Sequence, residues 1–299
     1  MQNIPRIIGQ YDRHREGPLL VVTAGVHGNE PAGIYALERI FKNLYKDAPM
    51  LHGKIIGLSG NRQGLKKGVR YIDEDLNRIW TLANLATQKA DSSEKKEMFH
   101  ILRILQQNLT ARYPRHYFID CHTTSSESAP YLSAQDQNEN LSWAQQFPLH
   151  IVRGFSDLIQ GGLDAYETRM GMTGFVCEAG QHQSKASIEN LEGMIWLALH
   201  QVCGLPFEDL EHFPKAVHNI EKKRTSRKIF EILYCHHITP ADHFKMKPGY
   251  QNFQKIEKDE HLASQNGKPI YSRWDAYLFM PLYQQQGNEG FFIIQETSA

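Results

Sequence analysis

The sequence has no long apolar segment. Its longest apolar run near the N-terminus, residues 19–24, is interrupted by Thr23 and is far shorter than the ~20 residues that cross a bilayer. The first residues also lack the basic stretch followed by an apolar stretch that marks a secretory signal. We therefore expect a cytoplasmic protein without a membrane partner.

An excess of charge of either sign is also missing. The 299 residues include 33 Lys and Arg and 33 Asp and Glu, so the net charge is zero. Such a chain has no overall positive field that would attract a polyanion. The composition therefore argues against a nucleic acid partner, and it leaves open whether the chain forms a homo-oligomer.

Cysteine is scarce, and the four cysteines are far apart in the sequence. None forms a Cys-x-x-Cys pair, so the sequence predicts neither a disulfide framework nor a cysteine-ligated zinc site. We expect these side chains to be small buried apolar groups. Histidine, by contrast, is frequent with 15 residues, so a single histidine is weak evidence for any site.

Strand-like and helix-like segments alternate over the first two thirds of the chain. Short apolar β-branched runs predict strands, and apolar residues at helical spacing predict the intervening helices. This alternation is typical of an α/β fold with a mixed, largely parallel sheet flanked by helices. The predicted strands are 19–24, 54–58, 116–121 and 174–177, and the predicted helices are 31–44, 94–109 and 187–203.

The texture of the sequence changes after Pro206. A charged stretch up to Arg227 is followed by short strand-like segments separated by Pro-Gly and Gly-Asn turn signals. We therefore predict an α/β domain over residues 1–210 and a small β-rich C-terminal domain over 211–299. The strands expected in the second part are 229–234, 250–256, 276–282 and 291–294.

Ligand-type side chains follow several predicted strands, where an α/β sheet places its functional loops. His27 and Glu30 lie in the loop after residues 19–24, His122 ends the third strand, and Glu178 ends the fourth. Two histidines and one glutamate suit a catalytic zinc ion whose fourth position is open to water, and Glu178 would then accept a proton from that water. Read singly, His122 is equally consistent with a buried hydrogen-bonded histidine and Glu178 with a helix cap.

Four segments occur in the order of the motifs of the succinylglutamate desuccinylase/aspartoacylase family, a branch of the zinc-carboxypeptidase-like superfamily. The sequence resembles that family in Gly25-Val-His-Gly-Asn-Glu-Pro-Ala-Gly33, Arg70-Tyr-Ile-Asp-Glu-Asp-Leu-Asn-Arg78, Asp120-Cys-His122 and Glu178-Ala-Gly180. The second segment is highly specific, whereas His-x-x-Glu and Asp-x-His are shared by the wider superfamily. The resemblance spans residues 25–180, and the C-terminal part resembles the family's second domain in place and size.

The resemblance implies a zinc-dependent deacylase that cleaves the amide bond of small N-acyl amino acids. It implies that His27, Glu30 and His122 bind one Zn²⁺ ion per chain and that Glu178 is the general base. Arg70 would polarise the scissile carbonyl group. Residues that would contact a carboxylate-bearing substrate are Asn77, Arg78, Arg169 and Tyr283, of which Arg169 and Tyr283 lie where the match to the family is loose.

Two other functions remain open at this point. A metallocarboxypeptidase acting on small peptides shares the metal ligands and an Asn-Arg pair, and a non-catalytic binding protein could use the same fold. A serine hydrolase is disfavoured, because Gly57-Leu-Ser-Gly-Asn61 lacks the final glycine of the Gly-x-Ser-x-Gly motif. After Glu178 the sequence Ala-Gly-Gln-His182 departs from aspartoacylase itself, so the acyl group and amino acid stay undefined.

Overall fold

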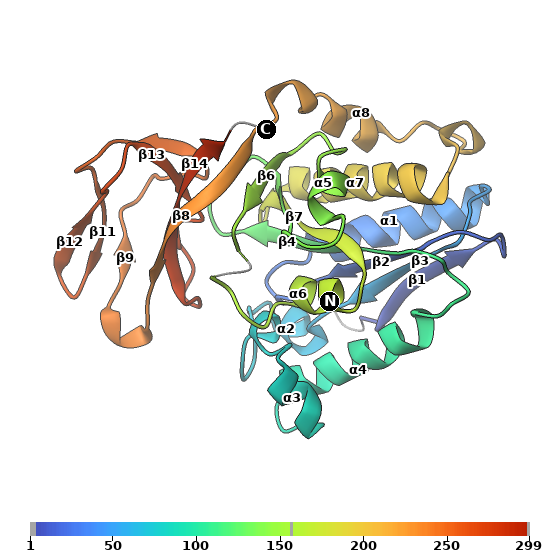
Figure 1. Ribbon diagram of the computed structural model, residues 1–299, viewed down its shortest axis with the longest axis horizontal. Helices are drawn as coiled ribbons and strands as arrows, with labels where there is room; N and C mark the ends of the chain where they lie inside the picture. Colours follow the sequence, from blue (N-terminus) through green and yellow to red (C-terminus); the bar gives the residue numbers. More distant parts are fainter. Residues whose placement is uncertain (1–3, 156–157, 298–299) are drawn as a thin grey trace.

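The computed structural model describes residues 4–155 and 158–297, and a single eleven-stranded sheet runs through them (Figure 1). The strands lie in the order β1-β3-β2-β4-β7-β5-β6-β8-β14-β13-β10. Their bounds are β1 Ile7–Asp12, β2 Leu19–Ala24, β3 Lys54–Ser59, β4 His116–Thr124, β5 Tyr131–Ser133, β6 His150–Arg153, β7 Thr173–Gln181, β8 Ile229–His237, β10 Gln254–Ile256, β13 Ala276–Phe279 and β14 Glu289–Thr297.

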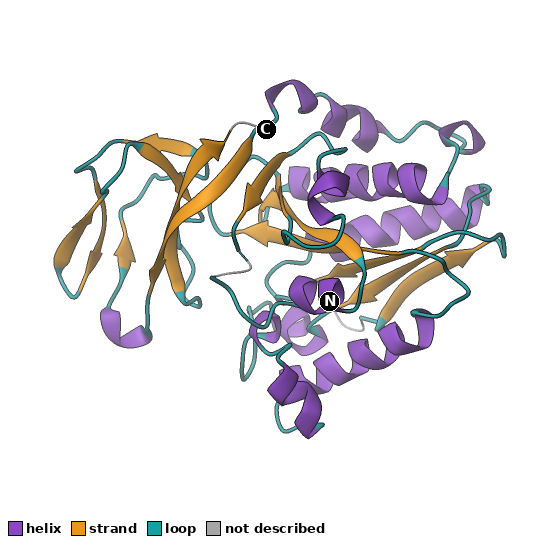
Figure 2. Cartoon of the chain, viewed as in Figure 1, coloured by secondary structure: helices purple, strands orange, loops and turns teal. Residues whose placement is uncertain are grey.

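The central strands β3, β2, β4 and β7 are mutually parallel, as the alternation of strands and helices predicts. Helices cover both faces of this part of the sheet (Figure 2). Their bounds are α1 Ala32–Asp47, α2 Arg62–Lys67, α3 Leu82–Thr87, α4 Ser93–Asn108, α5 Asn140–Ala144, α6 Leu163–Arg169, α7 Lys185–Cys203 and α8 Lys215–Glu221. The mixed α/β fold class is therefore confirmed.

Strand β2 shows why the sequence folds in this way. Its side chains alternate between two apolar clusters, so that Leu20 and Val22 pack with α1 and α7, whereas Leu19 and Val21 pack with α4. A strand that is buried on both faces is apolar at almost every position, which accounts for the sequence of β2, where Thr23 is the one polar residue. Ser92 caps α4 through its hydroxyl group, and Gly204 ends α7 in the left-handed conformation.

The C-terminal strands extend the same sheet and add a small second one. β8 pairs in parallel with β6, and β14, β13 and β10 continue the sheet outward in antiparallel pairs. The second sheet has the order β12-β11-β9, with bounds β9 Lys245–Met246, β11 His261–Gln265 and β12 Lys268–Tyr271. These strands form the lobe on the left of Figure 1.

Several elements differ from the sequence predictions. The segments expected at 250–256 and 276–282 form strands only over β10 and β13. Asn252 and Phe253 form a turn, and residues 250–251 and 280–282 are irregular. Helix α8 packs on α7, and Val217 and Ile220 belong to the core of the α/β part, although they follow the expected division at residues 210 and 211. The division into two domains therefore stays a prediction. None of the described helices is both long and apolar enough to span a membrane.

Candidate metal and active site

The loop after β2 brings His27 and Glu30 to the C-terminal edge of the sheet. Glu30 directly precedes Pro31, the residue at which α1 begins. The loop lies close to the segment around Gly64, since a Cβ atom at Gly28 would come within 2.0 Å of the Gly64 carbonyl carbon. The Gly28 amide also donates a hydrogen bond of 3.0 Å to the Arg70 carbonyl oxygen. Only glycine allows this close approach, which fixes the loop against the segments around Gly64 and Arg70.

Strands β4 and β7 supply the next two side chains. His122 and Glu178 are direct neighbours in the parallel register of these strands. Both strands continue beyond the ends predicted from the sequence, to Thr124 and Gln181. His122 and Glu178 therefore lie within their strands and not at the last strand residue. Each residue is less than one tenth exposed.

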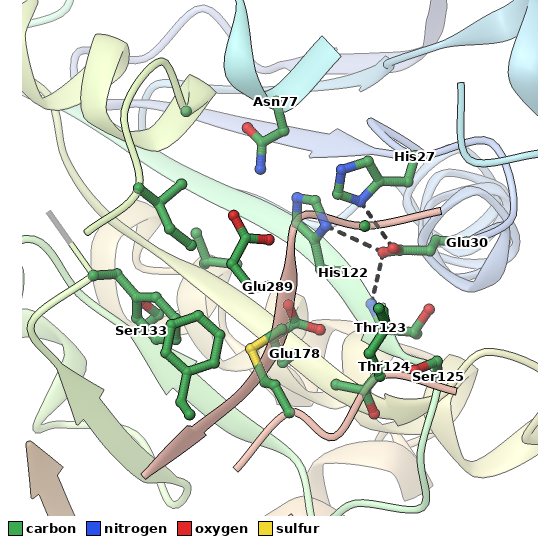
Figure 3. A pocket seen from close by; sticks show the side chains of 18 of the residues that line it. His27, Glu30, Asn77, His122, Thr123, Thr124, Ser125, Ser133, Glu178 and Glu289 are labelled. Atoms are coloured by element: carbon green, nitrogen blue, oxygen red, sulfur yellow. Dashed lines mark hydrogen bonds and ion pairs between the residues drawn. The ribbon is translucent and has the colours of Figure 1, made fainter. Parts of the chain in front are cut away.

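His27, Glu30 and His122 form a compact group, which we call the metal group (Figure 3). One nitrogen or oxygen atom from each residue lies within 4.8 Å of the others. The Glu30 carboxylate is 2.8 Å from Nδ1 of His27 and 3.1 Å from Nδ1 of His122, and it accepts a hydrogen bond of 2.9 Å from the Thr123 amide. Two imidazole nitrogens and a carboxylate thus converge on one point.

Each histidine of the metal group contacts a further carboxylate through its second ring nitrogen, Nε2. Nε2 of His122 lies 2.9 Å from Asp120, and Nε2 of His27 lies 3.1 Å from Asp75. A carboxylate on the second nitrogen fixes the ring orientation and raises the basicity of the nitrogen that faces the metal. The donor set and its supports therefore fit a zinc ion.

The electrostatics of this group favour positive charge between the ligands. Burial alone would raise the pKa of Glu30, but His27 and His122 outweigh it and hold this pKa well below its ordinary value. Burial alone would lower the pKa of His122, yet Asp120 and Glu30 raise it well above its ordinary value. A site that stabilises protons in this way also stabilises a metal cation.

Glu178 has a different environment. Burial raises its pKa to about 8, with further contributions from the nearby carboxylates of Glu30 and Asp120. Its Oε2 atom has no hydrogen-bond partner among the described residues, and the side chain lines the same pocket as the metal group. An unpartnered buried carboxylate beside a metal site is the arrangement that a general base requires.

Arg70 lies beside Glu30 of the metal group. Its Nε and Nη2 atoms donate hydrogen bonds of 3.0 and 2.9 Å to Asp75, while Nη1 lies 3.9 Å from Glu30. Asp75 also accepts a hydrogen bond from the Asn77 amide, so this residue both orients the arginine and caps the turn. The guanidinium group is thereby fixed at the wall of the pocket.

Asn77 and Arg78, in a short 3₁₀ helix over Leu76–Arg78, also line the pocket. The Asn77 side-chain oxygen accepts a hydrogen bond from the Leu163 amide. Arg78 Nη2 lies 3.1 Å from both carboxylate oxygens of Glu289, the first residue of β14. Arg78 is therefore already paired with a carboxylate from the C-terminal strands.

Two of the predicted substrate contacts lie elsewhere. Arg169 is exposed, donates a hydrogen bond of 2.9 Å to the Trp80 carbonyl oxygen, and is not among the residues that line the pocket. The Tyr283 hydroxyl group donates to the Lys247 carbonyl oxygen and accepts from the Tyr250 amide, outside the pocket. Neither side chain lines this pocket in the structure, so a substrate contact at Arg169 or Tyr283 stays a prediction.

The pocket also contains residues that sequence reasoning did not identify. Tyr131 is the cross-strand neighbour of Glu178, is fully buried, and has no partner for its hydroxyl group among the described residues. His182 lines the pocket and lies 2.7 Å from the Thr123 hydroxyl oxygen through Nδ1. The one available signal was the Gln-His departure after Glu178, whereas nothing marked Tyr131 or Glu289.

Comparison with known proteins bears on this geometry. The catalytic-domain model of the succinylglutamate desuccinylase/aspartoacylase family matches residues 16–194, more than half of the sequence. The chain belongs to this family. The four sequence segments that resemble the family, which contain the metal group, Arg70 to Arg78 and Glu178, all lie inside the matched region. Glu289 lies outside it.

Known proteins that are similar to the chain match different shares of it. An N-acyl-aromatic-L-amino acid amidohydrolase (carboxylate-forming) of Xenopus tropicalis is 29% identical over 289 residues, which cover 86% of this chain and 88% of that protein. A succinylglutamate desuccinylase of Pseudomonas aeruginosa is 28% identical but matches only 35% of this chain and 30% of its own length. Murine aminoacylase 3 has the same fold, with a TM-score of 0.61, 18% identity and coverage of 95% of this chain and 97% of that chain.

Proposed function

We propose that this chain is a zinc-dependent hydrolase that cleaves the amide bond of small N-acyl amino acids. Membership of the family and the names of its relatives support a deacylase. The observation that carries the proposal is the buried metal group in one pocket with the unpartnered carboxylate of Glu178. The cytoplasmic localisation of the chain remains a prediction from the sequence.

His27, Glu30 and His122 would hold the zinc ion, one per chain. When bound, zinc lowers the pKa of water and polarises a carbonyl group. Asp75 and Asp120 keep the two imidazole rings in place for this role.

Glu178 moves the proton. It accepts a proton from the attacking water as the new carbon–oxygen bond forms, and it returns that proton to the nitrogen as the carbon–nitrogen bond breaks. The products are a carboxylic acid and a free amino acid, so the atoms of one water molecule are consumed. The buried position of Glu178 keeps bulk water from competing for the proton.

Arg70 and the Asn77-Arg78 pair act on the substrate. Negative charge develops on the carbonyl oxygen during attack, and the Nη1 group of Arg70, which is not used by Asp75, can stabilise it. Arg78 offers a planar fork that matches a carboxylate, so it would bind the amino acid's carboxylate together with the Asn77 amide.

A substrate panel tests the proposal. The zinc-loaded protein is expected to release amino acid from N-acyl amino acids and to leave N-acylated dipeptides intact. Cleavage of the dipeptides alone would make the chain a metallocarboxypeptidase instead. Binding of N-acyl amino acids by protein that never turns them over, with zinc or without it, would identify a binding protein on this fold.

A further inference from the structure

The segment that carries Arg70 and Asp75 is held by a helix outside the pocket. Residues 70–75 form neither helix nor strand, so their position depends on groups from neighbouring elements. Helix α4 contacts this part of the chain, and Glu94 lies in its first turn. The Glu94 side chain is fully buried, although it carries a carboxylate. A carboxylate that is buried in this way needs hydrogen-bond donors around it.

The Glu94 carboxylate accepts four hydrogen bonds, two on each oxygen. Oε1 accepts one of 2.8 Å from the Ile72 amide and one of 2.8 Å from the side-chain amide of Asn61. Oε2 accepts one of 3.1 Å from the Asp73 amide and one of 3.3 Å from the Glu74 amide. Consecutive backbone amides that face one point form a binding site for an anion, and here a carboxylate of the chain itself occupies it.

Asn61 connects the same carboxylate to the loop of the metal group. Its side-chain oxygen accepts a hydrogen bond of 2.8 Å from the Gly64 amide, at the start of α2. Gly64 is the residue against which Gly28 packs, and the Gly28 amide donates to the Arg70 carbonyl oxygen. Glu94 therefore lies where α2, α4 and the segment of Arg70 meet.

The chemistry of these four contacts requires a carboxylate. All four partners of Glu94 are N–H donors, and a carboxylate offers acceptors on both of its oxygens. Glutamine has the same size, but its NH₂ group would face two of these donors. Two buried N–H groups would then lose their acceptor, and the backbone of residues 72–74 would move to find another one.

A movement of residues 72–74 would reach the site through Asp75. This side chain lies 3.1 Å from Nε2 of His27 and accepts two hydrogen bonds from Arg70. It therefore joins the support of a metal ligand and the orientation of the arginine in one residue. Displacements of about 1 Å at such positions can reduce a rate by roughly 10²-fold.

We propose that Glu94 is a positioning residue of the site. From α4 it holds the backbone of residues 72–74, so that Asp75 supports His27 and Arg70 faces the substrate carbonyl group. Glu94 itself is neither a member of the metal group nor part of the pocket lining. The role of Arg70 in this inference rests on the proposed function, whereas the support of His27 can be measured without turnover.

Zinc affinity tests the support of His27. Competition with a chelator should show that Glu94→Gln binds zinc about tenfold more weakly than the wild type, because the carboxylate behind a ligand has moved. Glu97→Gln is the matched control: Glu97 lies one turn further along α4, is also buried, and contacts Arg6 and Arg62. Its zinc affinity should equal that of the wild type. Wild-type affinity in Glu94→Gln overturns the inference.

A double-mutant cycle tests the positioning of Arg70. At saturating zinc, Glu94→Gln should lower kcat about tenfold with little change in KM, because Arg70 acts on charge that develops during attack. In the Arg70→Ala background the same substitution should change kcat by less than about twofold, since the group that it positions is missing. A general structural defect would act in both backgrounds, so a fully additive effect overturns the inference.

Amide hydrogen exchange on the wild-type protein covers the case in which Glu94→Gln does not fold. The amides of Ile72, Asp73 and Glu74 should exchange at least about a hundredfold more slowly than in an unstructured chain, because Glu94 accepts from each of them. Exchange at the rate of an unstructured chain would show that Glu94 does not hold this segment, and it overturns the inference.

The outcomes separate this inference from the proposed function. If the wild type hydrolyses no N-acyl amino acid, the proposed function is refuted, and the zinc affinities and exchange rates still decide the role of Glu94. Hydrolysis together with wild-type zinc affinity in Glu94→Gln upholds the proposed function and overturns the inference.

Discussion

The metal group and the apolar residues that line the same pocket come from different elements of the fold. The metal group comes from one loop and one strand of the parallel part of the sheet, within the region that matches the family model. Of the apolar residues that line the same pocket, Phe155, Ile159 and Val176 also lie inside the matched region, whereas Met280, Leu282 and Phe292 lie beyond it, after β13 or on β14. The metal group therefore lies wholly inside the region that matches the family, whereas the apolar lining of the pocket is drawn from inside and outside that region.

Removal of the metal ligands should have the largest effect, and it should act through the loss of zinc and not through the apolar lining of the pocket. We expect the His27→Ala, His122→Ala double variant to lose its zinc and all measurable activity, because Glu30 alone cannot hold the ion. Elemental analysis should give close to one zinc per chain for the wild type and for Phe155→Ala. Stoichiometric zinc in the double variant would refute the assignment of the metal group.

Replacement of the base should separate proton transfer from metal binding. Glu178→Gln keeps the size of the side chain and removes its ability to accept a proton, so kcat should fall by roughly 10²–10⁴ with zinc retained. Steady-state kinetics and metal analysis on the same sample check this. Loss of zinc would make Glu178 a ligand, and unchanged turnover would exclude it from the reaction.

Much of the site around the metal group was predictable, because it is encoded by local sequence. The strands that hold His122 and Glu178 contain short apolar runs, residues 117–119 and 175–177, and the loop with His27 and Glu30 is bounded by a strand and a proline. The apolar lining of the pocket and the contact of Glu289 with Arg78 were not predictable in this way. Strands β5 and β6 have three and four residues, too few to show a periodicity, and Glu289 meets Arg78 across 211 residues of sequence. A glutamate in a C-terminal strand has no local mark of such a contact.

The two arginines should differ in which kinetic constant they control. Arg78→Lys keeps the charge but loses the planar fork, so KM should rise about tenfold while kcat changes little. Arg70→Ala should lower kcat mainly, because charge on the carbonyl oxygen develops only during attack. Both constants are measured on an N-acetyl amino acid and on its carboxamide. Equal wild-type efficiency on the acid and the carboxamide would contradict carboxylate recognition.

A smaller effect, on stability, is expected at Glu167 on α6. This side chain is buried, neither of its oxygens has a hydrogen-bond partner among the described residues, and burial together with Asp120 and Asp164 raises its pKa well above the ordinary value. The folded state therefore holds this proton more tightly than the unfolded state. Its contribution to stability is present below the ordinary pKa and is lost as the pH rises toward the folded value.

Glu167→Gln should consequently stabilise the protein by about 1–2 kcal/mol at pH 8 and by much less at pH 4, because glutamine has no proton to lose. Chemical denaturation at the two pH values measures this difference in the free energy of unfolding. Glu189→Gln, an exposed position on α7, serves as the control and should show no such dependence. A wild-type advantage that grows with pH would show that Glu167 is ionised and paired.

The parallel pairing of β6 with β8, where Ile151 lies opposite Ile229, has a consequence for how a substrate is measured. This pairing places the strand of His122 and the strand of Glu289 in one hydrogen-bonded sheet, so no hinge separates the metal group from Glu289. Opening by rigid-body rotation would break the backbone ladder. We therefore expect the separation between the metal group and Glu289 to stay constant, so that the length of a bound molecule would matter as well as its charge.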